Sequence, residues 1–409
     1  MPRYQQPLVV LVLYFFLAVS DAFLFSTKSL HLHDVVHDVV RCHHQYSSVR
    51  CRSHKSSNNS NNNNNRIDKG FNLLELASAV IPQGRIVQTA KESWKFLWQR
   101  FMTELAPQDQ EGNYQRPQYG FSNTLGSIDF PIETGRYHVY VGNPCPWCHR
   151  VRLVVNILGL EDLMGMTVLL DDPIKASRGG WVFDTPPKQA PKVQDLRQLY
   201  DELQPGYTGR CTAPLLVDWK SRRIVSNESK DIVRMLPLLL EAATKDTTTM
   251  LDLTPSDLIS TIDETNEWVY RLLNNGVYRC GFSTKQQAYD RASLDVLQGL
   301  QRCQDILSRQ DFLCHNDRFT ESDLMLLPTM LRFDGVYSPL FGAGGTHIRL
   351  ECDYPAIYQW MKRCWTTIPG VQESIDITDA CESYYKQLFP LNPGGILPRP
   401  VTAKALRLE

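Results

Sequence analysis

The chain has 409 residues, with 43 Lys and Arg against 44 Asp and Glu and a formal net charge of −1. This balance argues against a nucleic-acid partner, because nucleic-acid-binding domains are usually strongly basic. The length predicts two folded domains with appendages. Its 11 cysteines are too few for a disulfide scaffold in a chain this long, and they fit a largely reduced interior.

The first residues have the features of a secretory signal. A short apolar run, residues 8–19, lies between Arg3 and the cleavage-like sequence Ser20-Asp21-Ala22. Residues 1–22 are therefore predicted to be a signal peptide rather than a membrane span. No later apolar run is long enough for a bilayer, so no stable membrane span is expected in the mature chain.

Residues 23–70 are rich in Ser, His, Arg and Lys and poor in acidic residues, as transit peptides are. A signal peptide followed by Phe23 and a basic stretch resembles the two-part plastid address of algae with complex plastids. We therefore expect plastid targeting, with secretion as the alternative. The Asn-rich run at residues 58–65 cannot bury apolar surface and predicts a disordered linker.

Residues 71–127 are predicted to form an N-terminal extension. Apolar residues recur at helical spacing in residues 71–81 and 90–105, which predicts one or two amphipathic helices. A loop rich in Pro and Gly follows and leads into the first folded domain.

The most informative motif lies between a predicted strand, residues 137–141, and a predicted helix, residues 151–160. It reads Cys145-Pro146-Trp147-Cys148. Pro146 suits a first helical position, which places Cys145 at the N-cap beside free amides and the positive end of the helix dipole. These groups favour the thiolate, and we expect Arg150 and Arg152 to favour it further. Cys145 is therefore the candidate nucleophile.

Two other interpretations of the cysteine pair are a zinc site and an inert buried pair. Zinc normally needs a second pair of ligands at similar spacing, and no such pair follows in the sequence. Thiol-transfer or redox chemistry without a metal is the favoured interpretation.

The next elements predict a thioredoxin-like domain over residues 128–245. A strand at residues 166–170, parallel to the first, is followed by a long polar loop that contains residues 179–183. A helix at 193–203, a hairpin of strands at 212–219 and 223–226, and a helix from the cap Asn227-Glu228-Ser229 to residue 240 come next. The order β-α-β-α-β-β-α with a Cys-x-x-Cys at the first helix is typical of this fold.

This order suggests roles for residues around a peptide-like ligand. Pro214 opens the third predicted strand and is expected to be cis, so that the backbone of Ala213 can pair with a thiol peptide. An ordinary trans proline is the alternative. At the next helix start, Ser229 offers a hydroxyl to an anion and Glu228 can bind an ammonium group. A γ-glutamyl group carries both charges.

Residues 250–388 predict an all-α domain. Helical patterns cover residues 258–273, 285–309, 320–331, 354–367 and 377–388, and acidic residues in Thr320-Glu321-Ser322-Asp323 mark a helix start. Residues 389–409 are rich in Pro and Gly and predict an irregular tail.

Residues 128–399 resemble the glutathionyl-hydroquinone reductases, the Xi class of glutathione transferases. The matching motifs are Gly135-Arg136-Tyr137-His138, Cys145-Pro146-Trp147, Gly180-Trp181-Val182-Phe183, Asn227-Glu228-Ser229, Asn275-Gly276-Val277-Tyr278, Leu331-Arg332-Phe333-Asp334-Gly335-Val336-Tyr337 and Asn392-Pro393-Gly394-Gly395-Ile396. They are spread over both predicted domains.

The resemblance implies an α/β thioredoxin-like domain followed by an all-α glutathione-transferase domain. It also implies a reaction in which Cys145 takes glutathione from a glutathionyl-hydroquinone and a second glutathione then releases glutathione disulfide. Glutathione would be a co-substrate, quinone or hydroquinone thioethers the small-molecule partners, and the assembly a homodimer. The implied contacts are Trp181, Ala213, Glu228 and Ser229 for glutathione and Tyr278, Tyr337 and Tyr384 for the aromatic substrate.

Two departures from the family pattern leave alternatives open. The family has Ala where this chain has Cys148, and a His near the C-terminal tyrosines is missing from Ser383-Tyr384-Tyr385. Cys148 could resolve a mixed disulfide, as in a dithiol thioltransferase or dehydroascorbate reductase. A non-catalytic protein that binds glutathione or another ligand is a further alternative. Classical conjugation is disfavoured, because it needs a Ser or Tyr hydroxyl to stabilise the glutathione thiolate.

Overall fold

The structure is a computed structural model that describes residues 82–117, 119–244, 251–345 and 347–408. The predicted signal peptide, transit-like segment and helix at residues 71–81 lie outside the described residues. The chain divides into two units, residues 1–100 and 101–409. Helix α4 (Gln83–Leu105) begins earlier than the helix predicted from residue 90, and it is continuous.

Within residues 101–409, a five-stranded sheet of order β3-β2-β1-β4-β5 forms the centre of the domain predicted to be thioredoxin-like, which is called the first domain below. Its strands are β1 (Tyr137–Gly142), β2 (Gly165–Asp171), β3 (Trp181–Val182), β4 (Leu215–Asp218) and β5 (Arg223–Ser226). As predicted, β2 is parallel to β1 and β4 pairs with β5 as an antiparallel hairpin. Strand β3 was not predicted, because only two residues of a polar loop pair with the edge of β2.

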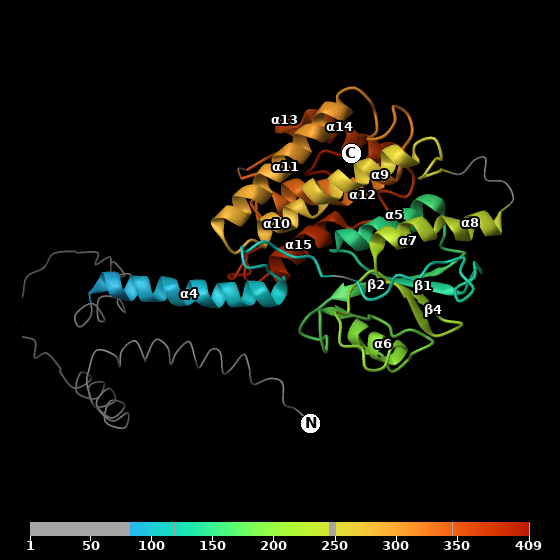
Figure 1. The fold of residues 1–409 in the computed structure, drawn as a ribbon, viewed down its shortest axis with the longest axis horizontal. Coiled ribbons are helices and arrows are strands. Elements are labelled where there is room, and N and C mark those ends of the chain that lie inside the picture. Colours follow the sequence, from blue (N-terminus) through green and yellow to red (C-terminus); the bar gives the residue numbers. More distant parts are fainter. Residues whose placement is uncertain (1–81, 118, 245–250, 346, 409) are drawn as a thin grey trace, which may run out of the picture. The chain divides into compact units, whose positions relative to one another are not determined.

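The helices of this domain cover both faces of the sheet (Figure 1). They are α5 (Pro146–Leu158), α6 (Leu196–Leu203), α7 (Ser229–Met235) and α8 (Pro237–Ala243). The single helix predicted up to residue 240 is wrong, because Pro237 lacks an amide hydrogen and begins a separate helix, α8. Helix α6 begins later than predicted, because the Asp195 side chain caps it at the Gln198 amide, 2.8 Å away.

The second domain is helical, as predicted. It contains α9 (Ile259–Val269), α10 (Gly276–Gly281), α11 (Gln286–Leu307), α12 (Glu321–Arg332), α13 (Leu350–Asp353), α14 (Pro355–Thr367) and α15 (Ile377–Gln387), with two π-helical turns, η1 (Tyr270–Asn274) and η2 (Phe333–Tyr337). Helix α12 is buried along its whole length and begins with a capping box of Thr320 and Asp323. The fold class is therefore a thioredoxin-like domain followed by an all-α domain, as the sequence predicted.

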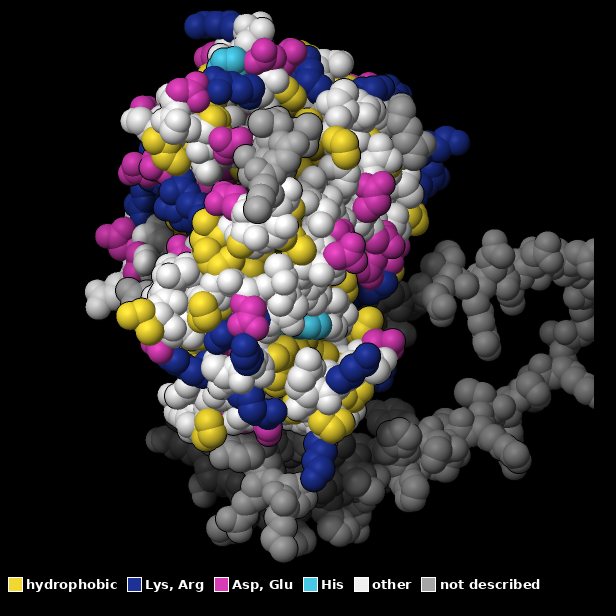
Figure 2. All heavy atoms as spheres, turned by 90° about the vertical axis from the view of Figure 1, so that its right-hand side faces the viewer, with side chains coloured by type: hydrophobic (Ala, Val, Ile, Leu, Met, Phe, Trp, Pro, Cys, Tyr) yellow, Lys and Arg dark blue, Asp and Glu magenta, His cyan; other side chains and the backbone are white. Residues whose placement is uncertain are grey.

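The surface has little segregation of charge on the face that includes α8. Figure 2 shows basic and acidic side chains interspersed there, with small hydrophobic patches between them, in keeping with the net charge of −1. Within the described parts of the chain, no helix combines the length and the apolar character needed to cross a bilayer.

Candidate active site

Cys145 caps α5 as the motif predicted. Its backbone is extended (φ −74°, ψ 117°), Pro146 begins the helix, and the amide of Cys148 donates to the Cys145 sulfur at 3.4 Å. The sulfur also lies 3.7 Å from the carbonyl oxygen of Ala213, which precedes Pro214 in a cis peptide bond. Cys145 is half-buried, whereas Cys148 is buried.

The surroundings of Cys145 favour its ionised form. Burial by itself would raise the pKa of the Cys145 thiol, but hydrogen bonds from Cys148 and from the amides of Cys148 and Trp147 outweigh that effect. The charge of Arg332 acts in the same direction, and the net result is a pKa below the ordinary value.

Arg150 and Arg152 were expected to add to this charge, but a different cation is the leading one. Arg150 donates to Asn274 Oδ1 at 2.7 Å and lies over the Trp147 ring, while Arg152 donates to Asn143 Oδ1 at 2.7 Å. The leading cation is Arg332, which comes from the second domain.

Cys148 has a different environment from Cys145. Its side chain is 0% exposed, and burial, with the nearby Cys145, holds the pKa of its thiol well above the ordinary value. Cys148 is thus a protonated donor to Cys145 when Cys145 is a thiolate.

His149 cannot serve as a base beside the two cysteines. Burial, followed by the charges of Arg332 and Arg152, holds the pKa of His149 well below its usual value. Arg332 donates to His149 Nδ1 at 3.1 Å, so the proton is on Nε2, which lies 2.8 Å from Ser374 Oγ. His149 is a neutral structural link.

Of the residues that the resemblance assigns to glutathione, Ala213 is in contact with the Cys145 sulfur. Trp181 packs on Gly142, at the end of β1, so closely that a Cβ there would lie 2.2 Å from its ring. Glu228 caps α7 by accepting from the amide of Lys230 at 3.0 Å, and Ser229 is buried beside it. The carboxylate of Glu228 therefore has a fixed position.

Two cavities border these residues. One, of about 590 Å³, is lined by Glu228, Arg150 and Tyr270, among others. The other, of about 150 Å³, is lined by Ala213, Trp147 and Arg116, among others. Arg116, whose guanidinium lies 3.6 Å from the centre of the Trp147 ring, was missed in the sequence, because nothing in its loop marks it as close to the cysteine motif.

The three tyrosines assigned to the aromatic substrate converge. The hydroxyl of Tyr384 lies 2.7 Å from that of Tyr278 and 3.0 Å from that of Tyr337, and the last two are 3.4 Å apart. Burial raises the pKa of all three phenols, so they are protonated donors. The half-buried Tyr278 lies against Trp147 with ring centroids 6.1 Å apart, which connects the cluster to the cysteine motif.

The π-helical turns place two of these tyrosines. Tyr337 is the last residue of η2, and Tyr278 follows η1 in α10. Each turn adds a residue to the helical repeat and so changes the direction of the side chains that follow. The periodicity of the sequence did not predict either turn.

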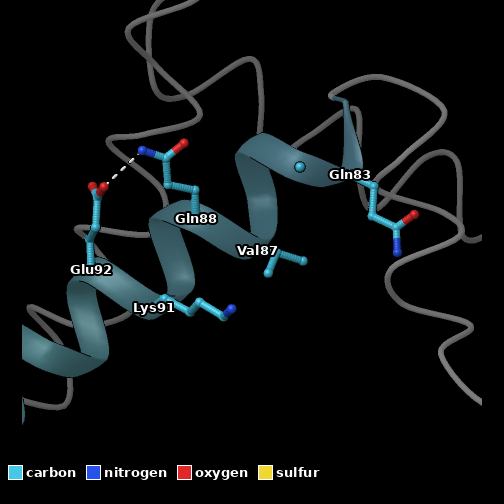
Figure 3. A pocket seen from close by; sticks show the side chains of 6 residues that line it. Gln83, Val87, Gln88, Lys91 and Glu92 are labelled. Carbon is cyan, nitrogen blue, oxygen red and sulfur yellow. Dashed lines mark hydrogen bonds between the residues drawn. The ribbon is translucent and has the colours of Figure 1, made fainter.

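Another hollow lies along α4 and is lined by Gln83, Gly84, Val87, Gln88, Lys91 and Glu92 (Figure 3). All six belong to one helix, and Gln88 donates to Glu92 at 2.9 Å. The side chains along this hollow do not converge on a common point where a ligand could bind, because they come from one helix. No group of three or more potential metal ligands occurs among the described residues.

Comparisons with known proteins agree with this geometry. Residues 144–238 match the family "Glutathione S-transferase, N-terminal domain", and residues 286–363 match "Glutathione S-transferase, C-terminal domain". Glutathionyl-hydroquinone reductase YqjG of Escherichia coli is 35% identical over 300 residues, which cover 70% of this chain and 88% of the relative. PcpF of Sphingobium chlorophenolicum, also named a glutathionyl-hydroquinone reductase, is 35% identical over 286 residues, with coverages of 68% and 87%.

The chain belongs to the Xi class of the glutathione transferase family. The solved glutathione S-transferase Xi of Phanerochaete chrysosporium has a TM-score of 0.66 and 34% identity, and the match covers 72% of this chain and 94% of that one. A glutathione-bound structure of E. coli YqjG has a TM-score of 0.61 and 34% identity, covering 69% and 92%. These relatives are enzymes by name, reductases and transferases, and the family inferred from the sequence motifs is confirmed.

Proposed function

We propose that this Xi-class chain is a glutathione-dependent reductase that cleaves glutathionyl-hydroquinones. The observation that carries the proposal is the juxtaposition of a thiolate-favouring cysteine, Cys145, with three hydrogen-bonded phenols, connected through Trp147. Two relatives, YqjG and PcpF, bear the name of this activity.

The first step exchanges one bond at the glutathione sulfur. The Cys145 thiolate attacks that sulfur, a disulfide forms between enzyme and glutathione, and the bond from sulfur to the aromatic carbon breaks. The electron pair of the broken bond goes to the ring, which takes up a proton and leaves as the hydroquinone. In the second step a glutathione thiolate attacks the mixed disulfide, and glutathione disulfide leaves with Cys145 restored.

The chain's own residues have separate parts in this scheme. Tyr278, the most exposed of the three phenols, would donate a hydrogen bond or proton to the leaving ring, with Tyr337 and Tyr384 orienting its hydroxyl. The glutathione would be held by Trp181, by the backbone of Ala213 next to Pro214, and by Glu228 and Ser229. The carboxylate of Glu228 would accept from the ammonium group of the γ-glutamyl end of glutathione. The hydroxyl of Ser229 would donate to the carboxylate of that same γ-glutamyl group.

A dithiol cycle is the second candidate, because Cys148 contacts the Cys145 sulfur through its amide. A buried thiol with a raised pKa is a poor nucleophile at neutral pH. Its pKa is raised partly by the Cys145 charge, which disappears when Cys145 is joined to glutathione. The Cys148 thiol therefore ionises more easily in the mixed disulfide than in the free enzyme, which favours its attack on that disulfide.

Single-turnover mass spectrometry with glutathionyl-menadiol tests both schemes. The proteins compared are wild type, Cys145→Ser and Cys148→Ala. The monothiol reductase predicts a glutathione adduct on Cys145 and released hydroquinone in wild type and Cys148→Ala, and neither in Cys145→Ser. A Cys145–Cys148 disulfide in wild type, with an adduct that persists only in Cys148→Ala, would establish the dithiol cycle.

Hydroquinone release by Cys145→Ser at the wild-type rate would contradict either scheme. Bound glutathione without an adduct or release in wild type would favour a non-catalytic binding protein. The wild-type protein mixed with menadiol and free glutathione is the control, because this mixture lacks the carbon–sulfur bond to be cleaved. An adduct on Cys145 there would not come from the thioether.

We also propose that residues 1–22 and 23–70 direct the chain to a plastid and that the mature protein is a homodimer. The first proposal follows from the leader composition alone. A fluorescent fusion to residues 1–70 tests the first by microscopy, with secretion as the opposing outcome, and sedimentation of the mature protein tests the second.

A further inference from the structure

Arg332 is the last residue of α12, and its side chain is 0% exposed. Its guanidinium donates to the carbonyl oxygens of Asn143 at 2.9 Å and Pro144 at 3.1 Å, the two residues before Cys145. It also donates to the carbonyl of Pro328 at 2.9 Å and to His149 Nδ1 at 3.1 Å. Every one of these acceptors is neutral.

A buried guanidinium that has only neutral partners is costly, because its charge is removed from water without an opposing charge. Within residues 82–408, gaps excepted, no ion pair that includes Arg332 occurs. Its positive charge is one of the causes that lower the pKa of Cys145, and it only partly opposes the rise that burial gives the pKa of the Tyr337 and Tyr384 phenols. The Cys145 thiolate is thus the anion that can balance it.

We propose that Arg332 is a positioning residue that fixes the Asn143–Cys145 turn against the second domain and supplies the charge that balances the Cys145 thiolate. The inference rests on the proposed function only for the role of that thiolate in turnover. Its geometric part, a guanidinium anchored to the turn before Cys145, stands on the contacts alone.

A second contact between the domains holds the same turn. Asn143 Nδ2 donates to Asp379 Oδ2 at 2.7 Å and to the carbonyl of Asp376 at 2.9 Å, at the start of α15. α15 carries Tyr384, and η2, directly after Arg332, carries Tyr337. The cysteine turn is therefore bonded to α12 and α15, and these helices lead to or carry Tyr337 and Tyr384.

The test depends on the ionisation of Cys145, so the groups around it and around Arg332 matter. These groups are Cys148, His149 and Arg152 on α5, Tyr337 on η2, and Cys381 and Tyr384 on α15, with Asp376 and Asp379 facing Arg152. His149 is held neutral and the phenols protonated, so a change near neutral pH in the reactivity of Cys145 reports its own thiol.

The experiment measures alkylation of Cys145 by iodoacetamide as a function of pH, followed by peptide mass spectrometry and without any substrate. The full-length proteins are wild type, Arg332→Met, Arg332→Lys and Arg150→Met. Arg150→Met is the matched control: Arg150 is also buried at the domain interface, where it donates to Asn274 and to the carbonyl of Met325. Circular dichroism verifies folding of each variant.

Arg332→Met is expected to raise the alkylation midpoint by one pH unit or more, which is about tenfold less thiolate at acidic pH. Arg332→Lys keeps the charge but cannot reach both carbonyls, so its midpoint should change by less while kcat for hydroquinone release falls about tenfold or more. Arg150→Met should keep the wild-type midpoint even where its melting temperature is lower.

The inference is overturned if folded Arg332→Met has the wild-type midpoint, or if Arg150→Met shifts it equally, which would show a general loss of packing. If Arg332→Met does not fold, Arg332→Lys decides: a wild-type kcat in that variant contradicts the positioning role. Absence of turnover in wild type with a shifted midpoint in Arg332→Met would reject the proposed function and leave the inference standing.

Discussion

The close contact between Gly142 and Trp181 allows a graded test of the glutathione site. A Cβ on Gly142 would lie 2.2 Å from the Trp181 ring, whereas ordinary contact begins at 3.4 Å, so the ring must move by about 1.2 Å (3.4 − 2.2) in Gly142→Ala. Overpacking of this kind costs about 1–3 kcal/mol. If half of that cost, about 0.5–1.5 kcal/mol, falls on the bound state, KM for glutathione rises by about 2- to 12-fold, since 1.4 kcal/mol is tenfold in affinity.

Steady-state kinetics and thermal unfolding measure the two parts of this prediction. Gly142→Ala should raise KM for glutathione, lower the melting temperature and leave kcat within about twofold, because Cys145 is not displaced. In Gly142→Ala/Trp181→Leu the ring is absent, so this double variant should be as stable as Trp181→Leu. A Gly142→Ala protein with wild-type stability and KM would refute the reasoning.

Three further predictions follow from the described contacts. Tyr278→Phe should lower the single-turnover rate of hydroquinone release by about 100-fold with little change in KM for glutathione, measured by stopped-flow absorbance, since a positioned acid contributes about 10²–10⁴; an unchanged rate would contradict the donor role. The rate of hydroquinone release should rise with pH through one ionisation, that of the Cys145 thiol, whose pKa lies below its ordinary value. A second ionisation in this pH profile, present in wild type and lost in His149→Gln, would contradict the neutral state of His149. Burial raises the pKa of Asp323 from 3.8 to about 6, so its contribution to stability is full below pH 3.8 and is lost as pH rises through about 6. Asp323→Asn should flatten that part of the pH dependence of the melting temperature, and an identical slope in both proteins would show that Asp323 does not titrate there.

Much of the fold was predictable because its signals are local. Alternation in β1 and helical spacing in α5 act over windows of about ten residues, and Pro146 and Thr320 mark helix starts through their own backbone chemistry. The break at Pro237 was also readable from the sequence, because a proline inside a helical pattern ends or kinks the helix. Its omission was an error of interpretation and not a limit of the sequence.

The candidate site was predictable where a motif supplies the chemistry. Cys145 was found from its position at a helix cap, which depends only on its neighbours. The assignment of Tyr278, Tyr337 and Tyr384 depended on the resemblance, because no periodicity relates residues so far apart. Their contact through the three hydroxyls became visible only in the folded chain.

By itself, then, the sequence determined the two-domain fold, the family and the nucleophile, because strand and helix patterns, caps and motifs act between neighbours in the chain. Only the tertiary structure decided which cation faces Cys145, where the π-helical turns direct the tyrosines, and that Arg116 covers Trp147. Charge interactions fall with distance in space, and Arg332 reaches the cysteine turn only because α12 packs on α5. That packing is a property of the whole core and has no local signature.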